Sequence, residues 1–201
     1  MATKKSASPQ HIYQIKVTLR GTKPPIWRRL LVPSSLTLAQ LHDVLQTAMG
    51  WAGGHMHEFR AGDRHFGTPD PEDLGMGSSY VEDERTIRLS KVLWRSSAKL
   101  IYTYDFGDNW EHAVVLEKIL PLLPDLRYPT CIDGKLACPP EDCGGIPGYY
   151  DLIGAIADPG HERHEEISEW MSDDFDPQAF SVDDVNRMLS PTLSPGKAAK
   201  N

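Results

Sequence analysis

Apolar and polar residues alternate strictly near the start of the chain. Every second position from Tyr13 to Leu19 is apolar and the positions between them are polar, which is the period-two pattern of a half-buried strand. Turn-forming residues at 21–25 precede a second apolar stretch, Ile26–Val32. The pattern predicts that these two segments pair as an antiparallel hairpin.

The periodicity then changes to that of a helix. Thr37 and Gln40 stand at the spacing of a capping box, in which each side chain bonds the other residue's backbone amide. Apolar residues recur every three or four positions from Leu38 to Ala48. We therefore expect a helix from Thr37 to about Met49 that lays one apolar face on the hairpin.

Further strands are predicted in the middle of the chain. Residues 55–60 and 99–106 have strand-like patterns. The turn-forming segment 105–109 leads into another strand over 110–119, so a second hairpin is expected. The polar, Gly-rich and acidic stretch 68–86 is interpreted as a long exposed loop.

Helices dominate the last third of the sequence. Apolar residues at helical spacing predict helices over 148–157 and 161–171, and Ser181 is placed to cap a third. Strands followed by helices indicate an α+β fold. The predicted architecture is a β-grasp-like (ubiquitin-like) strand-strand-helix-strand-strand core with additional C-terminal helices.

Composition narrows the class of protein. The 201 residues predict a single domain over 11–190, between disordered tails at 1–10 and 191–201 that are poor in apolar residues. The formal charge of −7 disfavours nucleic acid as the main partner, and no apolar run is long enough to cross a membrane. Three cysteines, an odd count, and a polar N-terminus favour a cytoplasmic location.

The segment Asp105–His112 has the densest set of reactive side chains. Asp108, Trp110 and His112 share a strand face if the strand begins early enough. A carboxylate two residues from an imidazole can orient and charge it for acid–base chemistry. The competing interpretation is that Asp105 and Asp108 bond turn amides while Trp110 packs in the core. This structural interpretation is favoured, because aspartate is common in turns.

Two groups contain metal-binding residue types. His55 and His57 lie two positions apart, so on a strand they share a face and can chelate a transition metal. Cys131, Cys138 and Cys143 lie close together, and zinc is the ion that they would hold. The cysteines lack a Cys-x-x-Cys pair and a fourth ligand, and the histidines can simply bond backbone or water, so structural roles are favoured for both groups.

The loop 138–145 is predicted to be rigid and to pack against the turn at 105–110. Its two prolines restrict the backbone, and its two glycines permit conformations closed to other residues. Acidic residues on both segments favour a small cationic ligand, a basic peptide or a metal over a phosphate. The candidate pocket residues are His57, Glu58, Asp105, Asp108, Trp110, His112, Glu141, Asp142 and Tyr149.

Several short motifs follow one another along the chain: Trp27–Leu30, Thr37–His42, Met49–Trp51, His55–Phe59, Tyr104–His112 and Cys138–Gly145. Together they resemble one family, the plasmid pRiA4b ORF-3-like proteins, which are named after the third open reading frame of a root-inducing plasmid. The resemblance spans about residues 11–190, and its two longest motifs are specific. It implies no activity, because the family is defined by sequence, although some members carry a transposon-resolvase label.

Two functions are compatible with these observations. The leading hypothesis is a non-catalytic binding or interaction module with an acidic, aromatic-lined pocket, whose partner is a protein or a small cationic ligand. The alternative is a metal-dependent hydrolase or nuclease linked to mobile elements, which would use His57, Asp105, Asp108 or His112. Recombinase chemistry gains no support, since neither a nucleophile beside an arginine cluster nor a DNA-binding element is recognisable.

Overall fold

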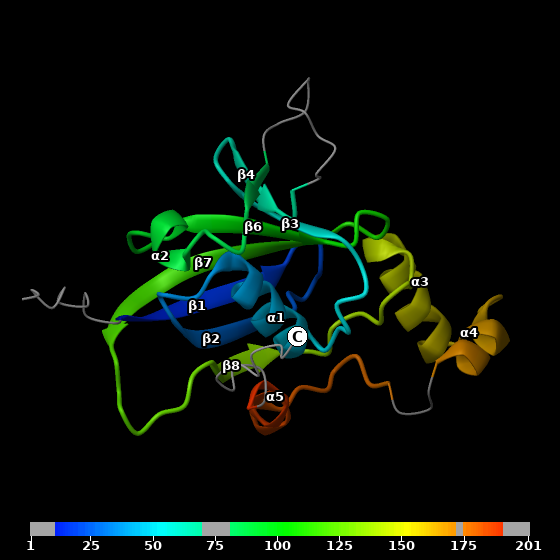
Figure 1. The fold of residues 1–201 in the computed structure, drawn as a ribbon. Helices are drawn as coiled ribbons and strands as arrows, with labels where there is room; N and C mark the ends of the chain where they lie inside the picture. Colours follow the sequence, from blue (N-terminus) through cyan, green and yellow to red (C-terminus); the bar gives the residue numbers. More distant parts are fainter. Residues whose placement is uncertain (1–10, 70–80, 172–174, 191–201) are drawn as a thin grey trace, which may run out of the picture.

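A computed structural model describes residues 11–69, 81–171 and 175–190, and one eight-stranded sheet organises this part of the chain (Figure 1). The strand order is β5-β4-β3-β6-β7-β1-β2-β8, and neighbours are antiparallel except β4 and β5. The strands are β1 His11–Leu19, β2 Trp27–Pro33, β3 His57–Ala61, β4 Arg64–Gly67, β5 Val81–Asp83, β6 Lys99–Tyr104, β7 Trp110–Pro121 and β8 Thr130–Lys135. The helices are α1 Leu38–Met49, α2 Leu89–Val92, α3 Gly145–Ala157, α4 His164–Trp170 and α5 Val182–Leu189.

The predicted first hairpin and its helix are confirmed. Strands β1 and β2 pair antiparallel, with Tyr13 opposite Val32. In the capping box, the Thr37 hydroxyl accepts a hydrogen bond from the Gln40 amide at 3.2 Å, and the Gln40 side chain accepts one from the Thr37 amide at 3.0 Å. Helix α1 ends at Gly50, whose φ of 92° suits glycine. Its apolar side lies across one face of the sheet (Figure 1).

The β-grasp prediction is wrong, although the broad α+β class is right. Strand β7 runs antiparallel along the whole of β1, from Leu19 opposite His112 to His11 opposite Pro121. The sheet then continues past β6 into β3, β4 and β5, and past β2 into β8. Alternation of residue types identifies a strand but does not determine its neighbours, and strands as short as β5 give almost no alternation to detect.

Parts of the other predictions fall on residues that the structure does not describe. Both predicted tails, 1–10 and 191–201, lie outside the described residues, as does 70–80 of the predicted loop 68–86. The described remainder of that loop contains β5, so it is not loop throughout. No helix in the described part of the chain is long and apolar enough to cross a membrane.

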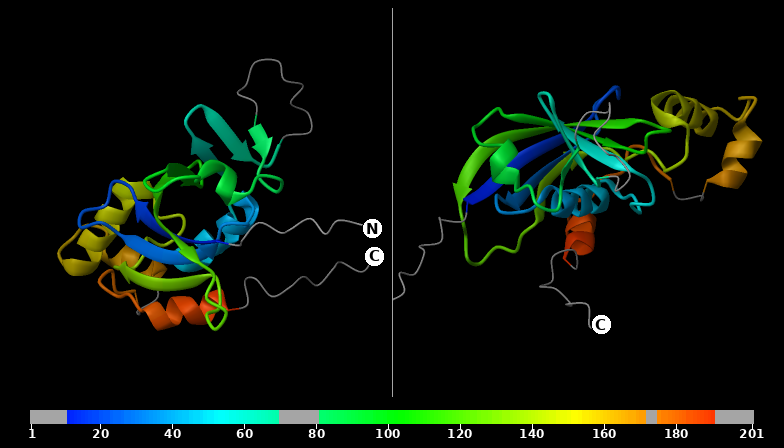
Figure 2. Two further views of the ribbon diagram at one scale, coloured as in Figure 1. Left: turned by 90° about the vertical axis from the view of Figure 1, so that its left-hand side faces the viewer. Right: turned by 45° about the horizontal axis from the view of Figure 1, so that its top comes forward.

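The C-terminal helices cover one end and one edge of the sheet. Helices α3 and α4 project beyond one end of the sheet (Figure 2). There Leu152, Ala155 and Ile167 form a small separate core. Helix α5 packs beside the edge strand β8. There the Asn186 side chain accepts a hydrogen bond from the Cys131 amide at 2.7 Å and donates one to its carbonyl at 2.9 Å. The side chain thereby replaces a further strand at this edge.

Candidate functional site

A pocket of about 690 Å³ opens beside the stem of the β3–β4 hairpin. Helix α1, the segment that leads from α1 into β3 and the turn after β6 contribute to its wall. Three imidazoles and one carboxylate supply the ionisable groups of the described lining, which contains neither lysine nor arginine. The lining residues are His42, Gly53, Gly54, His55, Met56, His57, Glu58, Gly67, Thr68, Pro69, Val81 and Phe106.

Two of these imidazoles are stacked face to face. His42 comes from α1 and His57 begins β3, and their ring centroids are 3.6 Å apart with planes inclined by only 7°. Stacked rings keep their nitrogen lone pairs in parallel planes. One metal ion therefore cannot lie in both planes, and this pair is not a chelate.

A buried network determines the protonation of His42. The Tyr102 hydroxyl accepts a hydrogen bond from the Gln46 side-chain amide at 2.7 Å, and its own proton then faces Nδ1 of His42, also at 2.7 Å. Nδ1 is thus the acceptor, and the ring proton sits on Nε2. Burial, followed by the nearby charge of His57, lowers the pKa of His42 to about 4. His42 is neutral at physiological pH and offers an N–H group.

His57 is held by a carboxylate instead. Its Nε2 lies 2.9 and 3.1 Å from the two carboxylate oxygens of Glu84, a residue that is only 4% exposed. A carboxylate acceptor keeps a proton on Nε2 and leaves Nδ1 as the second functional nitrogen. The stacked rings are consequently fixed by different partners and present different hydrogen-bonding atoms.

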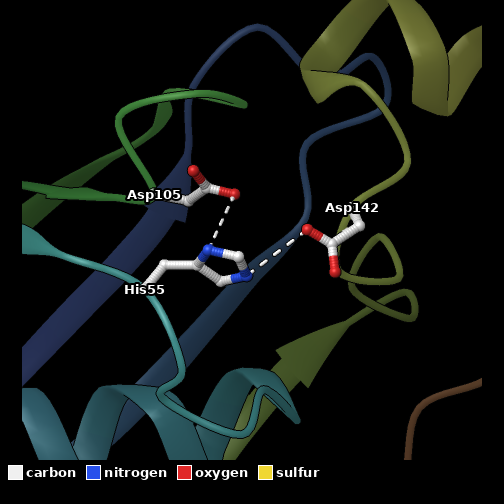
Figure 3. A group of neighbouring side chains, drawn as sticks. All are labelled: His55, Asp105 and Asp142. Carbon is white, nitrogen blue, oxygen red and sulfur yellow. Dashed lines mark ion pairs between the residues drawn. The ribbon is translucent and has the colours of Figure 1, made fainter.

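A second cluster adjoins the pocket (Figure 3). The imidazole of His55 lies between two carboxylates, with Nδ1 3.7 Å from Asp105 and Nε2 3.4 Å from Asp142. Asp105 is firmly positioned, because its backbone amide donates to the Met56 carbonyl and its Oδ1 accepts from the Gly107 amide, both at 2.8 Å. These three side chains come from three segments that are far apart in sequence.

Glu141 anchors the loop that carries Asp142. One oxygen of Glu141 accepts a hydrogen bond from the Tyr104 hydroxyl at 2.5 Å and the other accepts from the Ala52 amide at 3.0 Å. The Trp51 indole also donates to the Pro139 carbonyl at 2.9 Å. Burial, and then the bond to Glu141, raises the pKa of Tyr104 to about 12, so the hydroxyl remains a donor.

The predicted pocket residues separate into three groups. His57 and Glu58 line the pocket, whereas Asp105 and Asp142 adjoin it through their contacts with His55. The predicted contact between loop and turn is present, but the pocket of about 690 Å³ lies beside this contact and not within it. Other predicted residues lie elsewhere: Asp108 accepts from the Gly144 amide, Glu141 is the anchor described above, and Trp110, His112 and Tyr149 are buried.

The metal-binding patterns in the sequence are not reproduced as groups. Cys131 packs in the main core, Cys138 lies against that core and accepts a hydrogen bond from Arg28 at 3.3 Å, and Cys143 contacts both the main core and the small one. His55 precedes β3, so it does not share a strand face with His57, and each ring binds its own carboxylates. Among the described residues, the ligand atoms that lie close enough together to hold one ion include neither the three cysteines nor His57.

Four residues of the polar network at the pocket are absent from the predicted site: His42, Gln46, Glu84 and Tyr102. His42 and Gln46 stand four positions apart on α1, and this spacing was the available signal that both face one side of the helix. Tyr102 lies in the predicted strand 99–106, whose pattern does not distinguish a buried hydroxyl from an apolar side chain. Glu84 offered no signal, because it belongs to a stretch without periodicity.

Comparisons with known proteins identify one family and two similar proteins. The sequence profile of the plasmid pRiA4b ORF-3-like protein family matches residues 11–184. The uncharacterized protein y4hQ of Sinorhizobium fredii NGR234 is 40% identical over 179 residues, which are 89% of this chain and 90% of the relative. The crystal structure of MM3350 from Methanosarcina mazei Go1, a protein of unknown function, matches with a TM-score of 0.78 and 36% identity over 88% of this chain and 98% of its own.

Proposed function

Because this chain belongs to the plasmid pRiA4b ORF-3-like protein family, whose relatives above carry no assigned function, we propose its function from the pocket itself. The protein is a non-catalytic binding module that takes a small cationic ligand, or a basic side chain of a partner protein. The supporting observation is the pocket lining, which combines a carboxylate with three imidazoles and contains no lysine or arginine among its described residues.

Charge favours an amine over a phosphate. Glu58 lines the pocket, and the carboxylates of Asp105 and Asp142 converge on His55 at its wall. Among the described lining residues, a phosphate would meet these negative groups without a guanidinium or ammonium partner, whereas an ammonium group gains charge-assisted hydrogen bonds. The charge of the lining therefore favours the binding of an amine over that of a phosphate.

The pocket also offers apolar surface to the body of a ligand. Phe106 is 52% exposed and Met56 is 71% exposed, and both belong to the lining. An exposed aromatic ring attracts a cation above its face, and a thioether adapts to different shapes. An amine that carries an aromatic or aliphatic group matches this combination.

The alternative function, a metal-dependent hydrolase or nuclease, draws on one observation. Glu84 and His57 form a carboxylate–imidazole pair at the pocket wall, which is the arrangement that fixes the tautomer of a general base. In the binding proposal, the same pair simply orients a hydrogen-bonding nitrogen. A turnover assay with phosphodiester and ester substrates distinguishes the two functions.

The binding proposal is tested by calorimetry and thermal shift with tyramine, agmatine and a lysine-rich peptide, against inorganic phosphate and AMP. Amines should raise the melting temperature and the phosphates should not. Glu58→Gln and Phe106→Ala should each weaken amine binding by about tenfold, since each removes an interaction worth about 1–2 kcal/mol. Trp94→Ala is the matched control, because Trp94 is 64% exposed and outside the lining. Stabilisation by AMP without any by amines would contradict the proposal.

A further inference from the structure

We propose that His55, Asp105 and Asp142 form a binding site for one divalent transition-metal ion at the wall of the pocket (Figure 3). The inference goes beyond the proposed function, because it requires no organic ligand. In the described part of the chain, this is the group of three ligating side chains whose ligand atoms all lie within 4.8 Å of one another. The site uses an imidazole and two carboxylates and no thiolate.

The spacing of the ligand atoms suits a common ion. Three points within 4.8 Å of one another have a centre no more than about 2.8 Å from each, and nitrogen and carboxylate ligands bind zinc at about 2.0–2.2 Å. Side-chain shifts of roughly half an ångström to one ångström close that difference. His55 must turn one ring nitrogen toward the ion, and its side chain, 34% exposed, has room to do so.

The charges of His55, Asp105 and Asp142 favour the binding of a cation. Asp105 and Asp142 each have His55 as their ion-pair partner, and no lysine or arginine of the described residues pairs with either carboxylate. The distances of 3.7 and 3.4 Å are longer than good hydrogen bonds, so the single imidazole does not satisfy both carboxylates. A divalent ion between them would neutralise both at once.

Hydrogen bonds hold Asp105 and the residue next to Asp142, so part of the site is fixed before an ion binds. Asp105 is fixed by the Gly107 amide and by its own amide, and the neighbour of Asp142, Glu141, is fixed by Tyr104 and Ala52. Supported ligands lose little conformational entropy on binding an ion. Metal binding would also join three segments of the chain, so it should stabilise the fold.

The donor set selects the ion. Calcium and magnesium prefer an all-oxygen shell, whereas an imidazole with two carboxylates suits manganese, iron or zinc. The stacked pair of His42 and His57 cannot add a ligand in its present geometry, for the reason given above. Three protein ligands leave coordination positions open, and one of the three ligands, His55, lines the pocket.

The test uses the full chain after chelator treatment and dialysis, with Mn²⁺ as probe because it disfavours thiolates. Titration followed by the electron paramagnetic resonance signal of free Mn²⁺ should show one ion bound per chain, and Mn²⁺ should raise the melting temperature more than Mg²⁺ does. Asp142→Asn and His55→Gln should each weaken binding at least tenfold. Asp142 has a side chain that is 71% exposed, so its variant keeps the fold.

The control is Asp63→Asn, an exposed aspartate in the β3–β4 turn that should leave Mn²⁺ affinity unchanged. Absence of binding at millimolar Mn²⁺, or equal affinity in the wild type, Asp142→Asn and His55→Gln, would overturn the proposal. So would Zn²⁺ binding that survives both of these changes and disappears in Cys143→Ser. Metal binding without amine binding would support this site and reject the proposed function. Amine binding without metal binding would support the proposed function and reject this site.

Discussion

Acidification should destabilise the protein through His112, a fully buried histidine on β7. Its Nδ1 lies 3.3 Å from the Tyr102 carbonyl, and its Nε2 has no hydrogen-bond partner among the described residues. Burial lowers the pKa of His112 to about 4, against the opposing effect of backbone hydrogen bonds to Tyr102 and Trp110. The folded chain therefore keeps this ring neutral, with its proton on Nδ1.

The sign and size of the effect follow from linkage. The unfolded chain protonates this histidine near pH 6.5 and the folded chain only near pH 4. Between these values the unfolded state binds the additional proton, so the free energy of unfolding decreases as the pH falls. The contribution of His112 to the free energy of unfolding does not change above about pH 7. At about pH 4.5 it has decreased by about 2.5 kcal/mol.

The comparison with His112→Gln isolates this residue from the carboxylates, which titrate in both proteins. Urea unfolding at about pH 7 and about pH 4.5 should show that the wild type loses about 2–3 kcal/mol more than the variant. Proton NMR should show the His112 ring signal constant down to about pH 5. Equal losses in the two proteins, or a ring that titrates near pH 6.5, would refute the reasoning.

The remaining predictions concern stability and are measured by urea unfolding. Trp110→Ala should cost about 3–5 kcal/mol, because the predicted burial of Trp110 is confirmed at 0% exposure. Gly145→Ala should cost about 2 kcal/mol or more, since the glycine has a φ of +67° and a Cβ would lie 2.5 Å from a backbone carbonyl. Its control, Gly154→Ala in open space on α3, should instead stabilise by about 0.5–1 kcal/mol. Asn186→Ala should cost about 1–3 kcal/mol, because the Cys131 backbone at the edge of β8 loses both partners. A wild-type midpoint in any of the three destabilised variants would contradict the contact on which it depends.

The sequence was sufficient to predict those elements whose stabilising interactions lie within one short segment of the chain. The capping box of Thr37 and Gln40 lies within four residues, and it is present in the structure as the sequence predicts. The same holds for the β1–β2 hairpin and for Ser181, whose hydroxyl caps α5 by accepting from the Asp184 amide at 3.2 Å. Such interactions depend on backbone geometry that a few neighbouring residues determine.

The sequence also predicted the family, and it was sufficient to separate the two faces of strand β2. The resemblance predicted over residues 11–190 is matched by the family profile over 11–184. Arg28 and Arg29 are neighbours on β2, so the period of a strand places them on opposite faces: Arg28 is buried, and Arg29 pairs with Glu117 on the other side. The period of a strand is enough to decide this outcome.

Only the tertiary structure decided the order of the sheet and the composition of the site. The pairing of β7 with β1, the contact of His57 with Glu84, and the bond of Tyr104 to Glu141 join residues far apart in the chain. Periodicity reports which side of an element is apolar, and it carries no information on which element covers that side. Partners are selected by packing of the whole chain, so the polar groups that face one pocket become visible only when the sheet and its helix are assembled.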